Sequence, residues 1–398
     1  MSLPHASLFA QLLNLIPRSE FERLARLHGT EARSKGFSSW TQFVAMLFCQ
    51  LAQAHSLREI GLGLASALGK LVHLGVKRAP SRSTLAYANS HRTYRLYQDL
   101  FGRVLERARP WARGKGKLRL RAPVFLLDST VIDLCLEVYD WARFRRTKGA
   151  VKLHLVLEHE GHLPVFAHIT EGRVHDVRMA QRLTLPPGAI VAMDRGYNDY
   201  ALFNAWCERD VGFVTRMKEN AVYEVLERLD VPASSSILRD ELILLSGAGA
   251  QEKCPHILRR IVVWDAEKER ELVLLTNLYG LAATTVARIY KERWQIELFF
   301  KALKQNFRVK SFVGTTPNAV KTQLWTALLA ILILKLLRLR SAISWSLSNL
   351  VAILRMNLFT YRNLWEWLDE PWTTPPQPPP TRQLEFSFAM PIGIGQHT

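Results

Sequence analysis

Apolar residues recur at helical spacing through most of the first 110 residues, and this pattern predicts a helical region. The runs LFAQLLNLI, TQFVAMLFCQLAQA and LREIGLGLASAL each place apolar side chains three or four positions apart. Pro80 then interrupts the chain, and either Ser81 or Ser83 can cap a helix that runs to about Phe101. A helix over 57–68, a turn and a capped basic helix together have a helix-turn-helix-like layout.

After about residue 119 the pattern changes to short apolar and β-branched runs, which predict strands. Four such runs, PVFLLDSTVIDL, VKLHLVLEH, LPVFAHIT and GAIVAMD, are followed by the helical run YALFNAWCERD and by the strand VGFVTRMK. The second and third runs flank a short turn at Glu160 and Gly161, so they form a predicted hairpin. Strands that begin antiparallel and then alternate with helices indicate an α/β fold with a mixed sheet.

A β-rich insertion follows at about 219–284, where ILRDELILLSG, ILRRIVVWD and RELVLLTNL are predicted strands. Helical patterns resume with TTVARIYKERW, and the apolar run LWTALLAILIL at 324–334 belongs to a predicted helix over 319–340. That run has only 11 residues before Lys335, which is too short for an ordinary membrane span. We therefore expect a buried core helix there.

These changes of pattern divide the chain into three predicted parts. They are a helical domain with a basic connector at 1–118, a mixed α/β domain with its β-rich insertion at 119–362, and a Pro-rich tail at 363–398. We expect the tail, which contains PWTTPPQPPP, to be extended or disordered.

The connector at 103–121 is strongly basic. It carries eight Arg or Lys and one Glu, and Pro110, Gly114 and Gly116 predict that it is flexible. Such a segment either follows a phosphate backbone or is a solvated linker.

The stretch from Tyr290 to Lys304, YKERWQIELFFKALK, has two distinct sides when it is drawn as a helix. Tyr290, Arg293, Glu297 and Lys304 fall within an arc of roughly 60°. Apolar residues gather on a mostly opposite side, namely Ile289, Ile296, Phe299, Phe300, Leu303 and Phe307. Such a helix can bury one side and hold an acid among a phenol, a guanidinium and an ammonium. An ordinary amphipathic helix with a solvated charged stripe has the same pattern.

The basic composition of the chain indicates that its partner is a polyanion. The 398 residues are 48% hydrophobic, which is enough for a large core in two or three domains, and their net charge is +18. This charge points to nucleic acid or to an anionic membrane. Because the sequence shows neither a signal-peptide layout nor a long apolar span, we expect nucleic acid and no membrane. The four cysteines show no metal-ligand spacing and fit a reducing cytosol.

Three acids stand at positions that suit a metal site. Asp128 lies in the first predicted strand, Asp194 ends the fourth, and Glu297 lies on the charged side of the helix described above. Carboxylates with open water positions suit Mg²⁺, and two such ions can activate a water or a 3′-hydroxyl for phosphoryl transfer. Paired acids also hydrolyse sugars, but the basic composition favours a phosphodiester substrate.

On these residues the sequence resembles the DDE transposases of the insertion sequence four type. The motifs are DST at 128–130, DRGY at 194–197 and Y-x2-R-x3-E-x6-K at Tyr290, Arg293, Glu297 and Lys304. GRVHD and FVTRMK also resemble that family's connecting segments. The resemblance covers about 120–340, and the four-residue spacing is its specific part. It implies an RNase H-like fold with a β-strand insertion before the catalytic Glu.

The resemblance also implies an activity and a role for each site residue. The activity is Mg²⁺-dependent cutting at transposon ends followed by strand transfer into target DNA, with Mn²⁺ able to replace Mg²⁺. The implied metal ligands are Asp128, Asp194 and Glu297. The implied phosphate-holding residues are Tyr290, Arg293 and Lys304. Double-stranded DNA would be the partner of a homodimer, in the bacterial cytoplasm at the nucleoid.

Two other functions stay open on the sequence alone. One is a transposase that has lost catalysis and acts as a DNA-binding regulator, and the filled acid positions count against it. The other is a nuclease that lacks strand transfer.

The capped basic helix after Pro80 supplies further candidates for contact with DNA. They are Arg82, Tyr87, Asn89, Arg92 and Arg95. These side chains either face phosphates and base edges or form the basic surface of a small helical bundle.

Outside these motifs, a few residues have both a chemical and a structural interpretation. His159 and His162 could bind a metal, but we expect solvated turn residues. His175 and Asp176 are expected to be structural, with Asp176 at the start of a helix. The resemblance also implies that the inserted strands offer a Trp to a flipped base, and Trp264 is the candidate, but we favour a core position in a strand.

Overall fold

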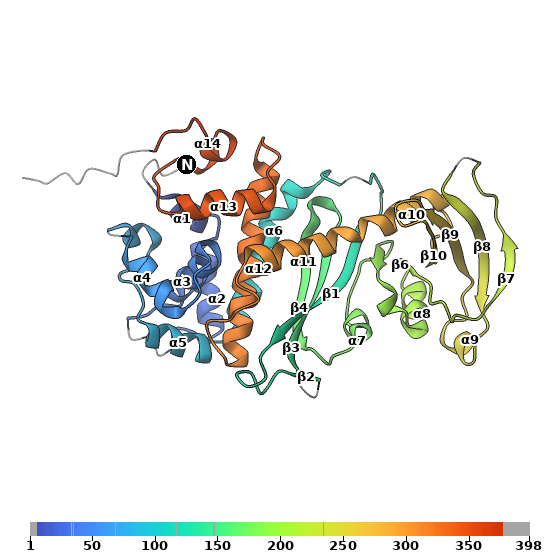
Figure 1. Cartoon of the computed structure of the whole chain (residues 1–398), viewed down its shortest axis with the longest axis horizontal. Helices are drawn as coiled ribbons and strands as arrows, with labels where there is room; N and C mark the ends of the chain where they lie inside the picture. The colour runs from blue at the N-terminus through green and yellow to red at the C-terminus, as the bar shows by residue number, and fades with distance from the viewer. Residues whose placement is uncertain are drawn as a thin grey trace, which may run out of the picture.

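The computed structural model of the chain describes residues 6–376 apart from 33, 35, 68, 117, 146, 147 and 234. Figure 1 shows three parts along the long axis of the molecule. Helices from both ends of the chain form one end, a sheet with long helices against it lies in the middle, and the strands of 223–276 form the other end.

The N-terminal region is helical, as the sequence predicts. Its helices are α1 (Leu8–Leu13), α2 (Arg18–Leu27), α3 (Ser39–Ala52), α4 (Leu57–Ala65), the 3-10 helix η1 (Lys70–Leu74), α5 (Arg82–His91) and α6 (Arg95–Ala112). The single helix predicted after Pro80 is wrong, because α5 and α6 are separated at 92–94. Asn318 donates to the Arg92 carbonyl at 2.7 Å and accepts from the Tyr94 N–H at 3.1 Å. A contact from far along the chain therefore fixes the break.

The basic segment 103–121 is not a flexible connector over its first half. It continues α6 as far as Ala112, even though Pro110, which has no N–H to donate, lies in the last turn of the helix. The apolar side of α6 is buried through Leu96, Tyr97, Leu100, Phe101, Val104, Leu105, Ala108 and Ala112. Burial of this side outweighs the breaker residues, which is why the prediction of a flexible connector is wrong there.

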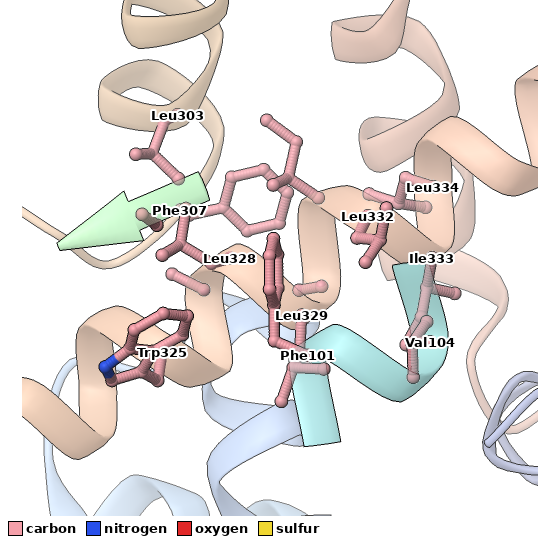
Figure 2. Packing of buried hydrophobic residues seen from close by; sticks show 14 of the residues in the cluster. Phe101, Val104, Leu303, Phe307, Trp325, Leu328, Leu329, Leu332, Ile333 and Leu334 are labelled. Atoms are coloured by element: carbon pink, nitrogen blue, oxygen red, sulfur yellow. The ribbon is translucent and has the colours of Figure 1, made fainter. Parts of the chain in front are cut away.

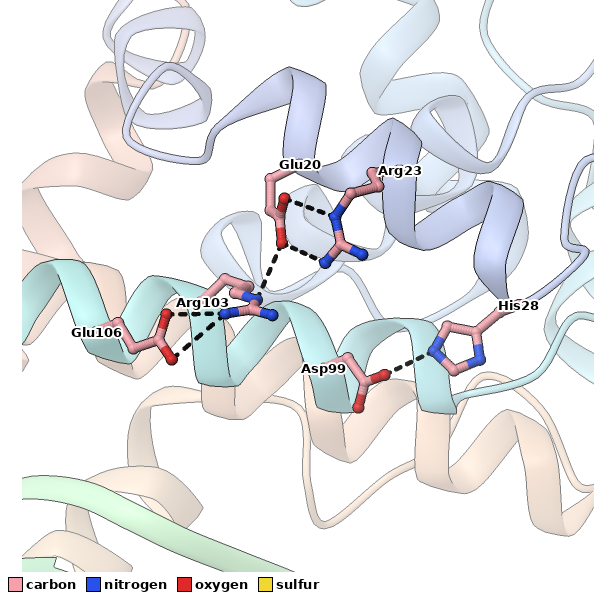
Figure 3. Close-up of polar contacts among 6 residues, drawn as sticks. All are labelled: Glu20, Arg23, His28, Asp99, Arg103 and Glu106. Carbon is pink, nitrogen blue, oxygen red and sulfur yellow. Dashed lines mark hydrogen bonds and ion pairs between the residues drawn. The ribbon is translucent and has the colours of Figure 1, made fainter.

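Ion pairs join the outer side of α6 to α2 (Figure 3). Arg103 Nε lies 2.9 Å from a Glu20 carboxylate oxygen, and Asp99 Oδ2 lies 2.8 Å from His28 Nε2. These groups are exposed to solvent, so the pairs contribute little to stability. The pairs orient α2 on α6, while the buried apolar side holds the two helices together.

Within the described residues, ten strands form one mixed sheet, in agreement with the predicted α/β class. The strands of its first half are β1 (Val124–Leu134), β2 (Arg143–Arg145), β3 (Lys148–Glu158), β4 (Leu163–Glu171), β5 (Ile190–Met193) and β6 (Gly212–Arg216). Between them lie η2 (Glu160–His162), α7 (Asp176–Ala180), η3 (Arg195–Tyr197) and α8 (Tyr200–Glu208). β3 and β4 form the predicted hairpin. β1 pairs antiparallel with β3 and parallel with β5, which runs parallel to β6.

The β-rich insertion extends this sheet and does not form a separate layer. It contains β7 (Tyr223–Arg228), β8 (Ile237–Leu245), α9 (Ala250–Lys253), β9 (Leu258–Asp265) and β10 (Arg270–Thr276). β10 pairs antiparallel with β6, and β9, β8 and β7 follow in that order. Three of these strands were predicted. β7 is missing from the prediction because its side chains are mostly exposed, so YEVLER lacks a buried apolar face.

The last part of the chain is helical again. It contains α10 (Ala283–Glu292), α11 (Trp294–Asn306), α12 (Pro317–Arg340), α13 (Leu347–Asn357) and α14 (Leu364–Asp369). The short helix α14 lies inside the predicted tail, where Trp367 is buried, so the tail is not extended from its beginning. The segment from 377 onward, including most of the Pro-rich run, lies outside the described residues.

The predicted core helix over 319–340 is confirmed by α12. Among the described helices, α12 is long and apolar enough to cross a membrane, but 89% of its most apolar 18-residue window is buried inside the protein. Phe101 of α6 packs against Trp325 of α12 with ring centroids 5.5 Å apart, and Leu303 of α11 and Phe307, which follows α11, belong to the same cluster (Figure 2). α12 therefore joins the N-terminal helices to α11, the helix that carries Glu297.

Candidate catalytic site

Two neighbouring strands place Asp128 and Asp194 side by side. β1 and β5 run parallel, and the last residues that they pair are Leu127 and Met193. Asp128 and Asp194 come directly after this pair. As predicted, one acid lies inside the first strand and the other follows the end of a short buried strand. The carboxyl ends of parallel strands are where α/β proteins place polar chemistry.

Glu297 is carried by a helix that is nearly continuous with the one before it. The single helix predicted over 290–304 is two helices, α10 and α11, which meet at Arg293. Arg293 keeps right-handed helical angles (φ −52°, ψ −30°), and its N–H bonds to the Tyr290 carbonyl at 3.1 Å, one residue closer than in an α-helix. The two helices continue in nearly the same direction (Figure 1), with Glu297 in the first turn of α11.

α11 lies across β1 with its apolar side buried. The buried residues agree with the predicted apolar side and include Ile296, Phe299, Phe300 and Leu303. Lys304 Nζ donates to the Val131 carbonyl at 2.8 Å. Burial lowers the pKa of Lys304, against the opposing effect of Asp133. Tyr290 is also buried, so the predicted charged side is not a solvated stripe but faces the sheet.

Arg293 joins two of the three acids. Its Nη2 lies 2.7 Å from Glu297 Oε1, and its Nη1 lies 3.5 Å from Asp128 Oδ2. The Arg293 side chain is only 13% exposed, and its guanidinium carbon lies 5.6 Å from the centroid of the Tyr290 ring. The sequence left open whether Arg293 pairs with an acid or with a DNA phosphate. In this structure it pairs with two acids, which fixes Glu297 beside Asp128.

Negative charge accumulates around Asp128. Burial raises the pKa of Asp128 to about 6, while the Ser129 N–H at 2.7 Å and the guanidinium of Arg293 act in the opposite direction. The charges of Asp194 and Glu297 raise the same pKa further. A divalent cation would offset this excess negative charge, and carboxylate oxygens are the donors that Mg²⁺ prefers. The three acids therefore fit a divalent-metal centre.

A second group of possible metal ligands lies where η2 meets the end of α10. Among the described residues, one ligand atom each from His159, His162 and Glu292 lies within 4.8 Å of the others, a spacing that the three acids do not meet. Glu292 Oε2 lies 3.6 Å from His159 Nδ1 and 3.8 Å from His162 Nε2. His159 Nε2 accepts the Leu118 N–H at 3.1 Å, so a neutral ring carries its proton on Nδ1, the atom that faces Glu292.

That proton position favours a polar His–Glu–His cluster over metal binding through His159 Nδ1. The prediction of solvated turn histidines is wrong for His159, which is 3% exposed. The residue missing from the prediction was Glu292, which packs against the turn from 130 residues further along the chain.

The reverse face of β1 carries a polar contact that was also not predicted. Ser129 Oγ donates to Asp176 Oδ1 at 2.6 Å. Asp176 begins α7, as expected, but its place beside the DST motif depends on a contact between residues 47 positions apart. The GRVHD motif was the available signal for it.

The N-terminal candidates divide into exposed and internal residues. The exposed ones are Arg82, Tyr87 and Arg95. Asn89 is buried and accepts from Gln42 Nε2 at 2.9 Å. Arg92 donates to the Phe37 carbonyl and lies over the Phe37 ring at 5.3 Å from its centroid. These internal contacts argue against the DNA contacts predicted for Asn89 and Arg92, whereas the role of Arg82 stays a prediction.

Trp264 does not lie in the core. It is 43% exposed near the end of β9, where it pairs with Glu271 of β10. The favoured core position is therefore wrong, and the role in base stacking stays a prediction.

Comparisons with known families and proteins cover most of the chain. Residues 119–333 match the family described as Transposase DDE domain, and residues 4–77 match one described as Domain of unknown function (DUF4372). The chain is 29% identical over 290 residues to the transposase y4zB of Sinorhizobium fredii (strain NBRC 101917 / NGR234), a match that covers 72% of this chain and 80% of that protein.

Two further relatives are transposases of insertion sequence elements. The chain is 32% identical over 221 residues to the one for IS5377 of Geobacillus stearothermophilus, which covers 55% of this chain and 57% of that protein. It is 28% identical over 224 residues to the one for IS4SA of Synechocystis sp. (strain ATCC 27184 / PCC 6803 / Kazusa), a match that covers 54% of this chain and 60% of that protein. A solved piggyBac transposase synaptic complex with hairpin DNA aligns with 89% of this chain and 79% of that chain, but at a TM-score of 0.38 and 8% identity, too low to carry an argument.

Proposed function

Because this chain belongs to the family of the Transposase DDE domain, we propose that it binds the ends of an insertion sequence, cuts the DNA there and joins the cut strand to target DNA. The observation that carries the proposal is the contact of Arg293 with both Asp128 and Glu297, next to Asp194 at the end of the neighbouring strand β5. These acids are 66 and 103 residues apart in the sequence, and the sheet and α11 bring them to one place.

In this proposal Asp128, Asp194 and Glu297 hold Mg²⁺, and Mn²⁺ can take its place. The bound metal supplies Lewis-acid stabilisation of the phosphate and activates the attacking water or 3′-hydroxyl. Burial of Asp128 among other acids supports this role, because an ionised carboxylate there needs a cation nearby.

Arg293 and Lys304 supply the positive charge of the site. A guanidinium offers two parallel donors to a phosphate, so Arg293 can exchange its two carboxylate partners for a DNA phosphate. Lys304 offers a point charge close to β1, next to the Val131 carbonyl. Tyr290 packs under the Arg293 guanidinium and orients it.

The proposal extends to the whole chain. The mixed sheet is an RNase H-like domain whose insertion comprises β7–β10, and the exposed Arg82 on α5 takes part in binding the element ends. The net charge of +18 supports double-stranded DNA as the partner. We further propose a homodimer in the DNA complex and a location at the bacterial nucleoid.

An assay that joins pre-cut element ends to a plasmid tests the reaction. Asp128→Asn, Asp194→Asn and Glu297→Gln should each abolish Mg²⁺-dependent cutting and joining while sparing end binding, because each removes a metal ligand but keeps the side-chain shape. Glu106→Gln, at an exposed position on α6, is the matched control and should keep full activity.

The outcomes separate the proposed function from its alternatives. End binding without any cutting by the unaltered protein would indicate a DNA-binding regulator, and cutting without joining would indicate a nuclease. Full activity in any one of the three acid variants would remove that acid from the site.

A further inference from the structure

Ser129 is hydrogen-bonded to two acids on opposite faces of β1. Its backbone N–H donates to Asp128 Oδ1 at 2.7 Å, and its Oγ donates to Asp176 Oδ1 at 2.6 Å. Consecutive residues of a strand point to opposite faces of the sheet. Asp128 therefore faces α11 with Arg293 and Glu297, while Ser129 faces α7 on the reverse side.

Asp176 is itself held in place on that reverse face. Lys152 Nζ lies 3.3 Å from Asp176 Oδ1 and also donates to the Val174 carbonyl at 3.0 Å, with its side chain only 12% exposed. His154, which pairs with Ser129 across β1 and β3, lies 3.4 Å from the same oxygen of Asp176. Burial lowers the pKa of His154 to about 4, so Lys152 is the cation that balances Asp176.

A buried tyrosine, Tyr197, lies in the turn after β5, close to Asp194 in the chain. Tyr197 follows Asp194 by three residues, and its ring is buried. Burial raises the pKa of Tyr197, and the charges of Asp176, Asp128 and Asp194 raise it further. Direct contacts of Asp176 therefore join α7 to β1 and β3, and its charge also acts on the turn after β5.

We infer that Asp176 is a positioning residue for the metal site, because it anchors Ser129 from the reverse face and so fixes the Asp128 carboxylate. Its carboxylate, paired with Lys152, acts as a hydrogen-bond acceptor and not as a further metal ligand. An acid that served only the start of α7 would not need the Ser129 hydroxyl. This inference rests on the proposed function, since it concerns the same site.

The test is Mn²⁺ binding to the full chain, measured by electron paramagnetic resonance without any turnover. Asp128→Asn identifies the binding that belongs to the site. Asp176→Asn and Ser129→Ala should each weaken that binding about tenfold, as is usual for partners that orient metal ligands. The double variant should bind Mn²⁺ no more weakly than the weaker-binding single variant, because both changes act on the same Ser129–Asp176 hydrogen bond: Asp176→Asn removes the charge of the acceptor and Ser129→Ala removes the donor. Ser129→Thr keeps a hydroxyl and should bind Mn²⁺ like the unaltered chain.

Asp199→Asn is the matched control, because Asp199 also stands at a helix start and accepts the Leu202 N–H of its own helix at 2.8 Å. It should leave Mn²⁺ binding unchanged, and thermal melts should show all variants folded.

If Asp176→Asn binds Mn²⁺ as the unaltered chain does while Asp128→Asn does not, the inference is overturned and the proposed function stands. Additive losses would also overturn the inference. If Asp128→Asn leaves Mn²⁺ binding unchanged, the proposed metal site itself falls, and the inference falls with it.

Discussion

Arg293 is bound to acids before any phosphate reaches it, and this determines what its removal would change. Its guanidinium offsets charge at Asp128 and Glu297, at 3.5 and 2.7 Å. Lys304, in contrast, donates to a single backbone carbonyl, that of Val131. The two cations of the helix motif are therefore not equivalent, even though the sequence places both on one side of the same helix.

At this scale we predict that Arg293→Ala reduces end cleavage or complex assembly more than Lys304→Ala does. Loss of one charge-assisted contact costs about 1–3 kcal/mol. Both variants should stay folded, because the buried apolar side of α11 is untouched. Arg293→Lys, which keeps the charge but not the two parallel donors, should recover only part of the loss.

Binding and cleavage on the same end duplex, together with a thermal melt, measure this difference. If Arg293→Ala unfolds the chain while its activity per folded molecule is unchanged, Arg293 supports the helix and does not hold DNA.

At the scale of elements, α12 contains a lysine, Lys335, whose burial destabilises the folded chain. Lys335 lies within an otherwise buried helix, and its Nζ is 5.4 Å from the centroid of the Phe299 ring on α11. Burial, with a smaller effect from Arg338, lowers the pKa of Lys335 from 10.5 to about 7. Between these two pH values the unfolded chain binds a proton that the folded chain does not, so this residue makes stability rise as the pH rises from 7 to 10.5.

We therefore predict that Lys335→Met stabilises the fold by about 1–2 kcal/mol near pH 7, because it removes the cost of burying the ammonium. The gain should be largest at or below pH 7 and should shrink towards pH 10, where the lysine is neutral in the folded chain. Denaturant unfolding of both proteins at several pH values measures it. Lys301→Met, at an exposed position on α11, is the control and should show no such trend. A gain that does not depend on pH would contradict this explanation.

The sequence predicted those elements whose pattern is local. The strand around Asp128, the short strand before Asp194 and the buried side of α11 follow from periodicity alone. The break between α5 and α6 depends on Asn318, which comes from another part of the chain. Likewise, Pro110 led to the prediction of a flexible connector, because the residues around Pro110 do not reveal that α6 packs against α12.

The site was predictable to the same extent. The three acids and the basic residues beside Glu297 have fixed spacings within short motifs, whereas the Ser129–Asp176 contact joins two motifs. The β-rich insertion also depends on contacts between distant residues. Arg259 pairs with Asp240 at 2.6 Å and also donates to the Leu278 carbonyl, just before α10. Such a contact connects the inserted strands to the segment before α10, and no local sequence pattern predicts it.

For the whole molecule, the N-terminal helices share a core with the C-terminal ones. The Leu8 N–H donates to the Thr360 carbonyl at 3.0 Å, and Gln11 Oε1 accepts the Leu364 N–H at 2.9 Å. α12 packs against α3, α5 and α6 at once. The predicted boundary at 118 thus separates segments that bury one another in the structure.

We therefore predict that a fragment of residues 1–118 does not unfold cooperatively by itself, because it exposes the apolar surfaces that α12, α13 and α14 cover in the full chain. End binding by the helical region should accordingly be tested in the full chain, with Arg82→Ala compared with the internal Arg92→Ala. We expect Arg82→Ala to weaken end binding and its salt dependence without lowering the melting temperature, and Arg92→Ala to lower the melting temperature. Circular dichroism melts of the fragment and of the full chain measure the first expectation. A fragment that melts cooperatively at the temperature of the full chain would show that the N-terminal helices form an independent domain, as the sequence alone suggested.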